Sequence, residues 1–211
     1  MIIDFAAKLS EQIQYLPGHV AQEKMAPEHR LPHAQWEHYF ANAKKGGVLI
    51  LFYPVQTTIH TVLIQRPHYE GVHSGQVAFP GGAKEDADAT MIETALREAE
   101  EEVGASRKSV QVIGQLTELY IPPSNFLITP VVGFSQQRPD FVLEANEVAG
   151  IIEPTLHELL DEKSVGIKKI QVRSDIAIDA PYYDIQGRTV WGATAMMISE
   201  LNEILKRVSG L

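Results

Sequence analysis

The sequence predicts an α/β (α+β) fold in which a mixed β-sheet lies between helices, preceded by an N-terminal helical extension. Three observations support this fold class. Runs rich in β-branched and aromatic residues occur on both sides of residues 84–104. Those residues have helical periodicity, and residues 194–208 form a second amphipathic pattern. Strands that flank a central helix favour a mixed sheet covered by helices.

The composition indicates one ordinary globular domain. The chain has 211 residues, of which 45% are hydrophobic, so a substantial core can form. The formal net charge of −9 argues against a general nucleic-acid or membrane-surface binder, which would carry a basic stripe. An anionic substrate is still compatible with this charge, because a bound divalent cation reverses the local sign.

The absence of cysteine excludes disulfides, thiolate zinc sites and a cysteine nucleophile. Residues 1–18 have no basic region before an apolar run, so they indicate an amphipathic helix rather than a signal peptide. No apolar stretch approaches the roughly 20 residues that span a bilayer. We expect a soluble, cytoplasmic protein.

The N-terminal part divides into a helix and a less regular segment. Residues 1–16 are expected to be helical, and one face of this helix is apolar. Pro17 and Gly18 end it. Residues 17–46 are polar and are expected to be an irregular segment packed on the domain. Four histidines in this segment have no standard metal-site spacing, so we interpret them as surface residues. The expected organisation is an extension at 1–46 and a domain at 47–211.

The remaining chain supplies the strands and helices of that domain. Strands are expected at 46–54 and 60–67, and a third short strand within 75–82 is expected to end in a Pro-Gly-Gly turn. Further strand patterns are 110–121, 125–135, 147–154, 166–174, 176–186 and 188–192, with a short helix at 155–162. Met197, Ile198, Leu201, Ile204 and Leu205 form the apolar stripe of the last helix, which is either core or a homodimer surface.

The central helix carries an unusual run of acids. Asp88 or Thr90 can cap its start and Gly104 can end it. Glu98, Glu101 and Glu102 share one face at 100° per residue, roughly opposite an apolar stripe that can dock on a sheet. An acidic face exposed to solvent is the simplest interpretation. However, the acids lie near the helix C-terminus, where the macrodipole disfavours them, and few basic partners are available. A hard divalent cation, magnesium above all, would remove these penalties.

The segment from Arg97 to Gly104, "REAEEEVG", resembles the second half of the Nudix box, Gly-x5-Glu-x7-Arg-Glu-U-x-Glu-Glu-x-Gly-U, where U is aliphatic. The first half matches less well. Ala89 stands where the box has glutamate, with Asp88 one position earlier, and Gly82 is one residue out of register with the first glycine. The resemblance implies the Nudix fold and a hydrolase.

Residues 62–82 resemble the coenzyme A pyrophosphatase branch of that family, which has Leu-Leu-Thr-x-Arg-Ser/Ala-x3-Arg-x3-Gly-x3-Phe-Pro-Gly-Gly before the box. Leu63, Arg66, Gly75, Phe79, Pro80, Gly81 and Gly82 match this motif. "PPSNFLITPVVG" and "VWGATAMMI" resemble later segments of the branch, so the likeness covers about residues 47–205. One departure is Gly71, which stands where the motif has its second arginine. The contact to a phosphate must then come from elsewhere, with Arg66, His68 and His73 as candidates.

The resemblance implies roles for the box residues. Glu98, Glu101 and Glu102 are expected to ligate Mg2+ or Mn2+, with Glu101 also counted among the catalytic residues. Arg97 is expected to pair with a box glutamate and hold its conformation; an ordinary surface ion pair is the alternative. Gly81 and Gly82 are expected to let the backbone approach the substrate.

Residues outside the box complete the expected site. Segment 143–154 resembles the family segment that supplies an additional glutamate, so Glu147 is the candidate general base and Glu144 the reserve. An exposed loop acid is the alternative for Glu147. Ser124 and Phe126, with Tyr120, are expected to line the substrate pocket, although a core position suits Phe126 better.

The resemblance implies hydrolysis of the diphosphate of coenzyme A or an acyl-CoA, giving 3′,5′-ADP and 4′-phosphopantetheine or its acyl form. One alternative is another nucleoside diphosphate derivative, such as ADP-ribose, NADH or a dinucleoside polyphosphate. A second is a catalytically silent Nudix domain that binds a nucleotide as a sensor. A structural domain with an acidic helix is the third.

Overall fold

A six-stranded mixed sheet forms the centre of the molecule. The computed structural model describes residues 2–28, 30–71, 73–173 and 176–208. The path of the sheet is β2–β1–β8–β6, with β5 paired to β1 and β7 to β8. These strands are β1 (Lys44–Val55), β2 (Thr58–Thr61), β5 (Gly81–Ala83), β6 (Gln111–Gln115), β7 (Leu119–Ile121) and β8 (Phe126–Phe134). β1 and β8 are parallel and the other pairs antiparallel, so the predicted mixed sheet is confirmed.

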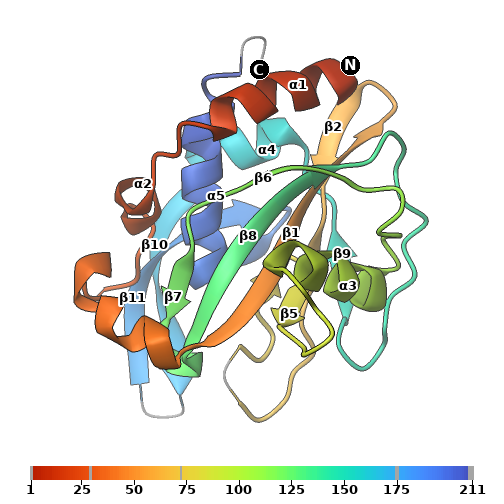
Figure 1. Cartoon of the computed structure of the whole chain (residues 1–211). Coiled ribbons are helices and arrows are strands. Elements are labelled where there is room, and N and C mark those ends of the chain that lie inside the picture. Colours follow the sequence, from red (N-terminus) through yellow and green to blue (C-terminus); the bar gives the residue numbers. More distant parts are fainter. Residues whose placement is uncertain (1, 29, 72, 174–175, 209–211) are drawn as a thin grey trace.

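The central strand β1 is buried on both faces, which explains its continuous apolar run. Successive side chains point to opposite faces of a strand. Leu49 and Leu51 enter one hydrophobic cluster with α3 (Met91–Val103), whereas Ile50 and Phe52 enter another with α1 (Ile2–Ile13) and α5 (Gly192–Leu205). Helices therefore cover both faces of the sheet, and Figure 1 shows α3 next to β1 and β5.

Two smaller three-stranded sheets complete the fold. One has the order β10–β11–β12 and the other β4–β3–β9, both antiparallel. Their strands are β3 (Leu63–Gln65), β4 (Val77–Ala78), β9 (Gly150–Ile152), β10 (Val165–Arg173), β11 (Ile176–Ile185) and β12 (Arg188–Trp191). The short helix α4 (Leu156–Leu160) begins at a capping box, in which Thr155 and Glu158 exchange hydrogen bonds.

The N-terminal segment packs on the same core as the C-terminal helix. The predicted apolar face of α1 is buried, and it shares its cluster with α5. Residues 17–46 are more regular than expected, because they contain α2 (His19–Glu23) and the 3-10 turns His33–Gln35 and Glu37–Asn42. The predicted stripe of α5 is buried, so it belongs to the core of this chain. None of the described helices combines the length and apolarity needed to cross a membrane.

Three strand predictions need correction. Residues 60–67, expected as one strand, are divided between β2, which ends at Thr61, and β3, which begins at Leu63 and belongs to another sheet. Gly81 and Gly82 do not form a turn: they lie in β5 and pair with Val48 and Gly47 of β1. Residues 110–121 form two strands, β6 and β7, rather than one. Both pair with β8, and the register of β6 shifts between Val112 and Gly114. These differences arise from pairing with remote strands, which local propensity does not encode.

Candidate active site

The helix α3 is fixed at both ends by the residues that the sequence indicated. Thr90 is its N-cap and accepts a hydrogen bond from the backbone N–H of Glu93 at 3.2 Å. Glu93 in turn accepts from the backbone N–H of Ala89 at 2.6 Å. Gly104 ends the helix with φ 72°, a conformation that glycine adopts without steric cost. The glutamates between these caps therefore have defined positions along the helix.

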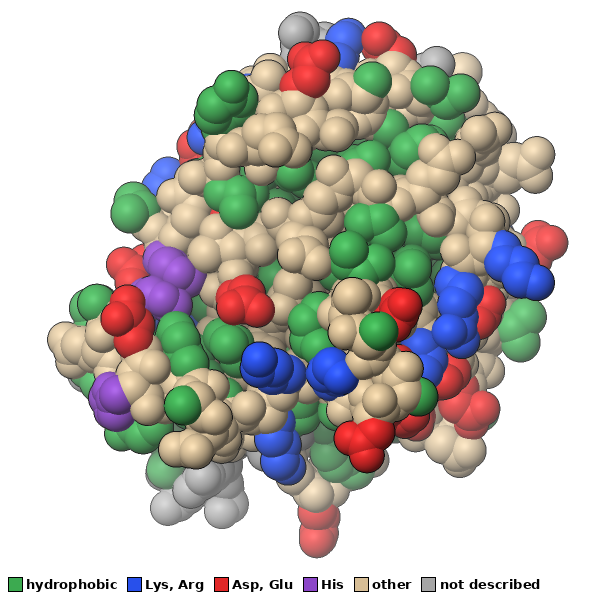
Figure 2. All heavy atoms as spheres, in the orientation of Figure 1, with side chains coloured by type: hydrophobic (Ala, Val, Ile, Leu, Met, Phe, Trp, Pro, Cys, Tyr) green, Lys and Arg blue, Asp and Glu red, His purple; other side chains and the backbone are tan. Residues whose placement is uncertain are grey.

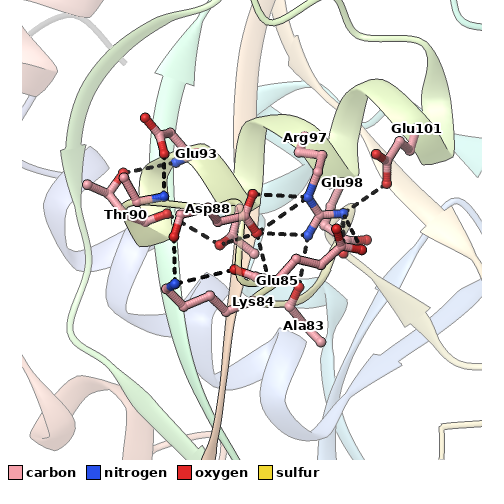
Figure 3. Close-up of polar contacts among 11 residues, drawn as sticks. Ala83, Lys84, Glu85, Asp88, Thr90, Glu93, Arg97, Glu98 and Glu101 are labelled. Atoms are coloured by element: carbon pink, nitrogen blue, oxygen red, sulfur yellow. Dashed lines mark hydrogen bonds and ion pairs between the residues drawn. The ribbon is translucent and has the colours of Figure 1, made fainter.

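Arg97 is buried at the centre of an acidic group, as Figure 3 shows. Its Nε donates to Asp88 Oδ1 at 3.1 Å and its Nη2 to Asp88 Oδ2 at 3.0 Å. Its Nη1 lies 3.0 Å from Glu98 Oε1 and 2.9 Å from Glu101 Oε2. Nη2 also donates to the carbonyl oxygen of Ala83 on β5 at 2.9 Å. One guanidinium thus joins α3, β5 and the loop between them.

The two-point contact between Asp88 and Arg97 is the strongest feature of this network. The hydrogen bonds from Arg97 hold the pKa of the Asp88 carboxyl well below its usual range, and the same bonds raise the pKa of Arg97. Thr94 Oγ1 and the backbone N–H of Glu85 also donate to Asp88 Oδ2. Arg97 is therefore buried, and its contacts extend beyond its own helix to Asp88 and Ala83.

The three expected metal ligands differ sharply in exposure. Glu102 is 1% exposed, the side chain of Glu98 is 14% exposed and that of Glu101 is 56% exposed. A fully solvated acidic face was the simplest expectation, and it is wrong for Glu102 and largely wrong for Glu98. The reason is that β5 packs against α3 on the polar side of the helix. Figure 2 shows acidic and basic side chains intermixed over this region, around α3 and β5.

Glu102 is held between two basic or donor groups. Its Oε2 accepts from the backbone N–H of Gly81 at 2.7 Å, and its Oε1 lies 3.9 Å from Arg66 Nη1. Burial nevertheless raises the pKa of Glu102 to about 7, because desolvation disfavours the charged form more than these contacts favour it. Burial also raises the pKa of Glu98, and the charge of Glu147 adds to both shifts. The structure thus brings Glu147 close to Glu98 and Glu102.

The reserve base Glu144 is oriented differently. Its Oε1 accepts from the side-chain amide of Asn146 at 2.8 Å. Its backbone N–H donates to the carbonyl oxygen of Glu102 at 3.0 Å. Glu144 therefore ties its loop to α3 through the main chain, whereas Glu147 contributes its charge to the carboxylate group.

The carboxylate oxygens are engaged with donors of the protein and are not arranged as a metal site in this structure. Over residues 2–28, 30–71, 73–173 and 176–208, no three histidine or acidic side chains are placed to hold a metal. Arg97 occupies one oxygen of Glu98 and one of Glu101, and Gly81 occupies one of Glu102. The donor set itself is all carboxylate, which suits a hard cation such as Mg2+.

The glycines of β5 allow close approach to these acids. A Cβ at Gly82 would lie 2.5 Å from Glu98 Oε2, which is the far end of a flexible side chain. A Cβ at Gly81 would lie 2.3 Å from the backbone oxygen of Gly47, which is part of the central strand. Gly81 therefore allows β5 to pair closely with β1, and Gly82 leaves space for the Glu98 carboxylate.

Alanine at each position is expected to have a different effect. Gly81→Ala should destabilise the fold by roughly 1–3 kcal/mol, because backbone must move. Gly82→Ala should change stability little but displace Glu98 and lower turnover. Urea unfolding and steady-state kinetics on both variants measure this. A Gly82→Ala protein with the kinetics of the wild type would contradict the role given to the space beside Glu98.

A cavity of about 460 Å3 lies beside this carboxylate group. Arg66 and His68 contribute to one wall, and Arg188 and Thr189 of β12 to another. Arg66 connects the cavity to the carboxylates, since it is also the group near Glu102. The volume lies within the range of about 300–1,000 Å3 that is usual for small-molecule sites.

Ser124 and Phe126 lie at the start of β8, in and after the 3-10 turn Pro122–Ser124. The Phe126 ring is partly buried against the larger hydrophobic cluster, as its preferred core interpretation suggested, and Lys44 Nζ lies 5.8 Å from its centroid. Tyr120 is buried and does not line the cavity; its hydroxyl donates to Asn125 Oδ1 at 2.9 Å. Neither Ser124 nor Phe126 contributes to the walls of the 460 Å3 cavity.

Comparison with known proteins identifies the family. The NUDIX domain family matches residues 43–179. The uncharacterized Nudix hydrolase NudL of Yersinia pestis (strain Pestoides F) is 33% identical over 178 residues, covering 83% of this chain and 85% of that relative. The chain belongs to the Nudix family. NudL of Yersinia pseudotuberculosis serotype O:1b has the same identity and coverage. The expected family is thereby confirmed, and the chain is a Nudix pyrophosphohydrolase that acts on a nucleoside diphosphate derivative.

Solved structures confirm the Nudix fold. The Nudix hydrolase RenU of M. smegmatis aligns with a TM-score of 0.56 at 17% identity, covering 80% of this chain and 89% of that one. A MutT/nudix family protein from Enterococcus faecalis aligns with a TM-score of 0.50 at 12% identity, covering 85% and 71% of the two chains. At these identities the likeness concerns the fold alone. The boundary expected at residue 47 stays a prediction, although the family match begins close to it.

The imperfect first half of the Nudix box has a structural explanation. The box has glutamate where this chain has Ala89, and Asp88 supplies the carboxylate that pairs with Arg97. The sequence indicated Asp88 as a possible helix cap and placed it one position before the missing glutamate. Thr90 is the cap, so Asp88 is free to contact Arg97. Arg188 and Thr189, by contrast, were missed, because β12 carries no local motif that predicts their position beside Arg66.

Proposed function

We propose that this Nudix hydrolase cleaves the diphosphate of coenzyme A or an acyl-CoA, giving 3′,5′-ADP and 4′-phosphopantetheine or its acyl form. The supporting observation is the position of Arg66, the motif arginine, between the buried Glu102 and the 460 Å3 cavity. A diphosphate placed at the carboxylates would extend into that cavity past a guanidinium, and guanidinium groups bind phosphate oxygens in two-point fashion.

Glu98, Glu101 and Glu102 would hold the divalent metal that Nudix hydrolases generally use. Mg2+ and Mn2+ both accept carboxylate oxygens. When bound, the metal neutralises diphosphate oxygens and lowers the pKa of water. To bind it, Glu98 and Glu101 would have to release Arg97 Nη1, because that atom contacts both carboxylates. Asp88 would then keep Arg97 in place through its two-point contact.

The side chains of this site have distinct parts in the reaction. Glu147 is proposed to accept the proton of the attacking water, because it is exposed and lies near Glu98 and Glu102. Arg66 is proposed to bind a phosphate oxygen, and the backbone N–H of Gly81 fixes the Glu102 carboxylate. Phosphoryl transfer depends mainly on such positioning and charge stabilisation.

Glu147→Gln is expected to lower kcat by roughly 10²-fold or more, because glutamine cannot accept the proton. Glu144→Gln is the matched control, as Glu144 lies on the same loop and is also exposed. It should leave kcat within about twofold, since its main-chain contact to α3 is retained. Steady-state kinetics with saturating magnesium measure both variants. A normal kcat in Glu147→Gln with a low one in Glu144→Gln would assign the base to Glu144.

A second substrate class is favoured by one residue. Gly71 replaces the second arginine of the coenzyme A motif, so ADP-ribose, NADH or a dinucleoside polyphosphate is the competing substrate. The test is a panel of coenzyme A, acyl-CoA and these three compounds with magnesium and manganese, with products identified by mass. Fastest release of 3′,5′-ADP from coenzyme A supports the proposal. A kcat/KM at least about tenfold higher for another member of the panel would overturn it.

A further inference from the structure

We propose that Arg188, on β12, forms with Arg66 a binding site for a phosphomonoester of the substrate, separate from the diphosphate that is cleaved. This inference rests on the proposed function and narrows its substrate class. The substrates that fit are nucleoside diphosphate derivatives that carry one further terminal phosphate group.

The cavity beside the carboxylates has walls from remote parts of the chain. Arg66 and His68 follow β3, and Arg188 and Thr189 begin β12, directly after the turn that joins β11 to β12. Ala149, just before β9, also contributes to its lining. The antiparallel pairing of β11 with β12 fixes Arg188 opposite Ile185. The position of Arg188 is therefore set by a strand register and not by a free loop.

The cavity lining is basic in an acidic protein. Two guanidinium groups and one imidazole line it, and none of its lining residues is Asp or Glu, although the chain has a net charge of −9. Lys168 of β10 adds a cation next to the wall, because its Nζ donates to Thr189 Oγ1. Asp184, the penultimate residue of β11, is the acid next to the β11–β12 turn, and its Oδ1 accepts from the backbone N–H of Gly187. This charge pattern favours a dianionic ligand.

Both arginines have donors that the protein leaves available. Arg66 Nε is buried without a hydrogen-bond partner, and Arg66 Nη1 is 3.9 Å from Glu102, beyond hydrogen-bond length. Arg188 is exposed, and within the described residues its guanidinium has no ion pair or hydrogen bond. A buried donor without a partner is costly, so a ligand oxygen at Arg66 would remove that cost.

Arg188 also supplies a second guanidinium, because the loop that follows Arg66 contains none. Residues 67–76, between β3 and β4, contain no lysine or arginine, and Gly71 stands where the motif has its second arginine. A second guanidinium from β12 restores a pair of arginines around the cavity. A phosphomonoester has three terminal oxygens and up to two negative charges, whereas a phosphodiester has a single charge. Two guanidinium groups therefore bind a phosphomonoester more strongly than a phosphodiester.

The test compares coenzyme A with dephospho-coenzyme A, which differ only in the phosphomonoester. The wild type should prefer coenzyme A. In Arg188→Ala, kcat/KM for coenzyme A should fall roughly 10- to 100-fold, mainly through KM, and that for dephospho-coenzyme A by less than about threefold. Arg188→Lys should show an intermediate loss, because it retains the charge without the two-point geometry. Arg207→Ala, at an exposed arginine of the C-terminal turn, is the matched control. It should leave kcat/KM unchanged for both substrates.

A binding measurement separates this inference from the proposed function. Calorimetry with 3′,5′-ADP, which has the phosphomonoester but no diphosphate to cleave, should show binding that Arg188→Ala weakens at least about tenfold. Such binding without coenzyme A hydrolysis would sustain the phosphate site and overturn the proposed function. If Arg188→Ala lowered kcat/KM equally for both substrates, or left 3′,5′-ADP binding unchanged, the phosphate site would be refuted even if coenzyme A is hydrolysed. If Arg188→Ala fails to fold, a wild type that treats the two substrates alike also overturns it.

Discussion

Glu102→Gln is expected to lower kcat by roughly 10²-fold or more while leaving the fold as stable as the wild type. The lower kcat and the unchanged stability both follow from the loss of a buried negative charge. Glu102 is 1% exposed, and burial raises its pKa to about 7, so the fold tolerates its charge poorly. Glutamine has the same shape and keeps an oxygen that can accept from the Gly81 N–H. It lacks the negative charge that makes a carboxylate a strong ligand of a divalent cation.

The experiment measures turnover and stability on the same preparation. Kinetics at several magnesium concentrations report the activity, and urea unfolding in the presence of a chelator reports the stability of the metal-free protein. Glu93→Gln is unsuitable as a control, because Glu93 accepts a capping bond from Ala89. Glu203→Gln is suitable, since Glu203 lies on α5, away from the carboxylates, and pairs only with exposed lysines among the described residues. Near-normal turnover in Glu102→Gln would refute its role as a ligand.

The sequence predicted the acidic helix and its position along the chain, because those features are local. Thr90 and Gly104 are strong end signals, and the apolar stripe that includes Ala95 and Ala99 has the helical period. The buried stripe of α5 was predictable for the same reason. The two fully buried leucines of β1 likewise followed from a continuous apolar run.

The depth of the site was not predictable from the sequence. Helical periodicity assigns Glu98, Glu101 and Glu102 to one face, but it does not say what packs against that face. Gly81 and Gly82 were interpreted as a turn, and only the pairing of β5 with β1 shows that they cover the polar side of α3. The burial of Glu102 follows from this tertiary contact.

The second wall of the cavity had no signal in the sequence either. Arg188 occupies the first position of an ordinary short strand, with no motif around it. It reaches the cavity beside Arg66 because β12 pairs with β11. Such a contact between remote segments depends on the topology of the sheets.

Asp88→Ala is expected to destabilise the protein by about 3 kcal/mol at pH 7. Breaking a buried ion pair by removing one partner costs about 3–5 kcal/mol. The lower end applies here, because Arg97 keeps its contacts to Glu98 and Glu101. Asp86→Ala is the matched control on the same loop: Asp86 is exposed, and its loss should change stability by less than about 0.5 kcal/mol.

The pH dependence of the stability difference between the wild type and Asp88→Ala tests whether that difference is electrostatic. The bonds from Arg97 hold the pKa of Asp88 below its unfolded value of about 3.9. A carboxyl whose pKa is depressed on folding contributes its full stability above the unfolded pKa and loses it as the pH falls toward the folded one. The gap in unfolding free energy between wild type and Asp88→Ala should therefore be constant from pH 7 to about pH 5 and shrink below about pH 4. A gap that stays constant at acid pH would mean that Asp88 stabilises the loop by packing or by neutral hydrogen bonds to Thr94 and Glu85. Arg97 would then be held in position by its other contacts.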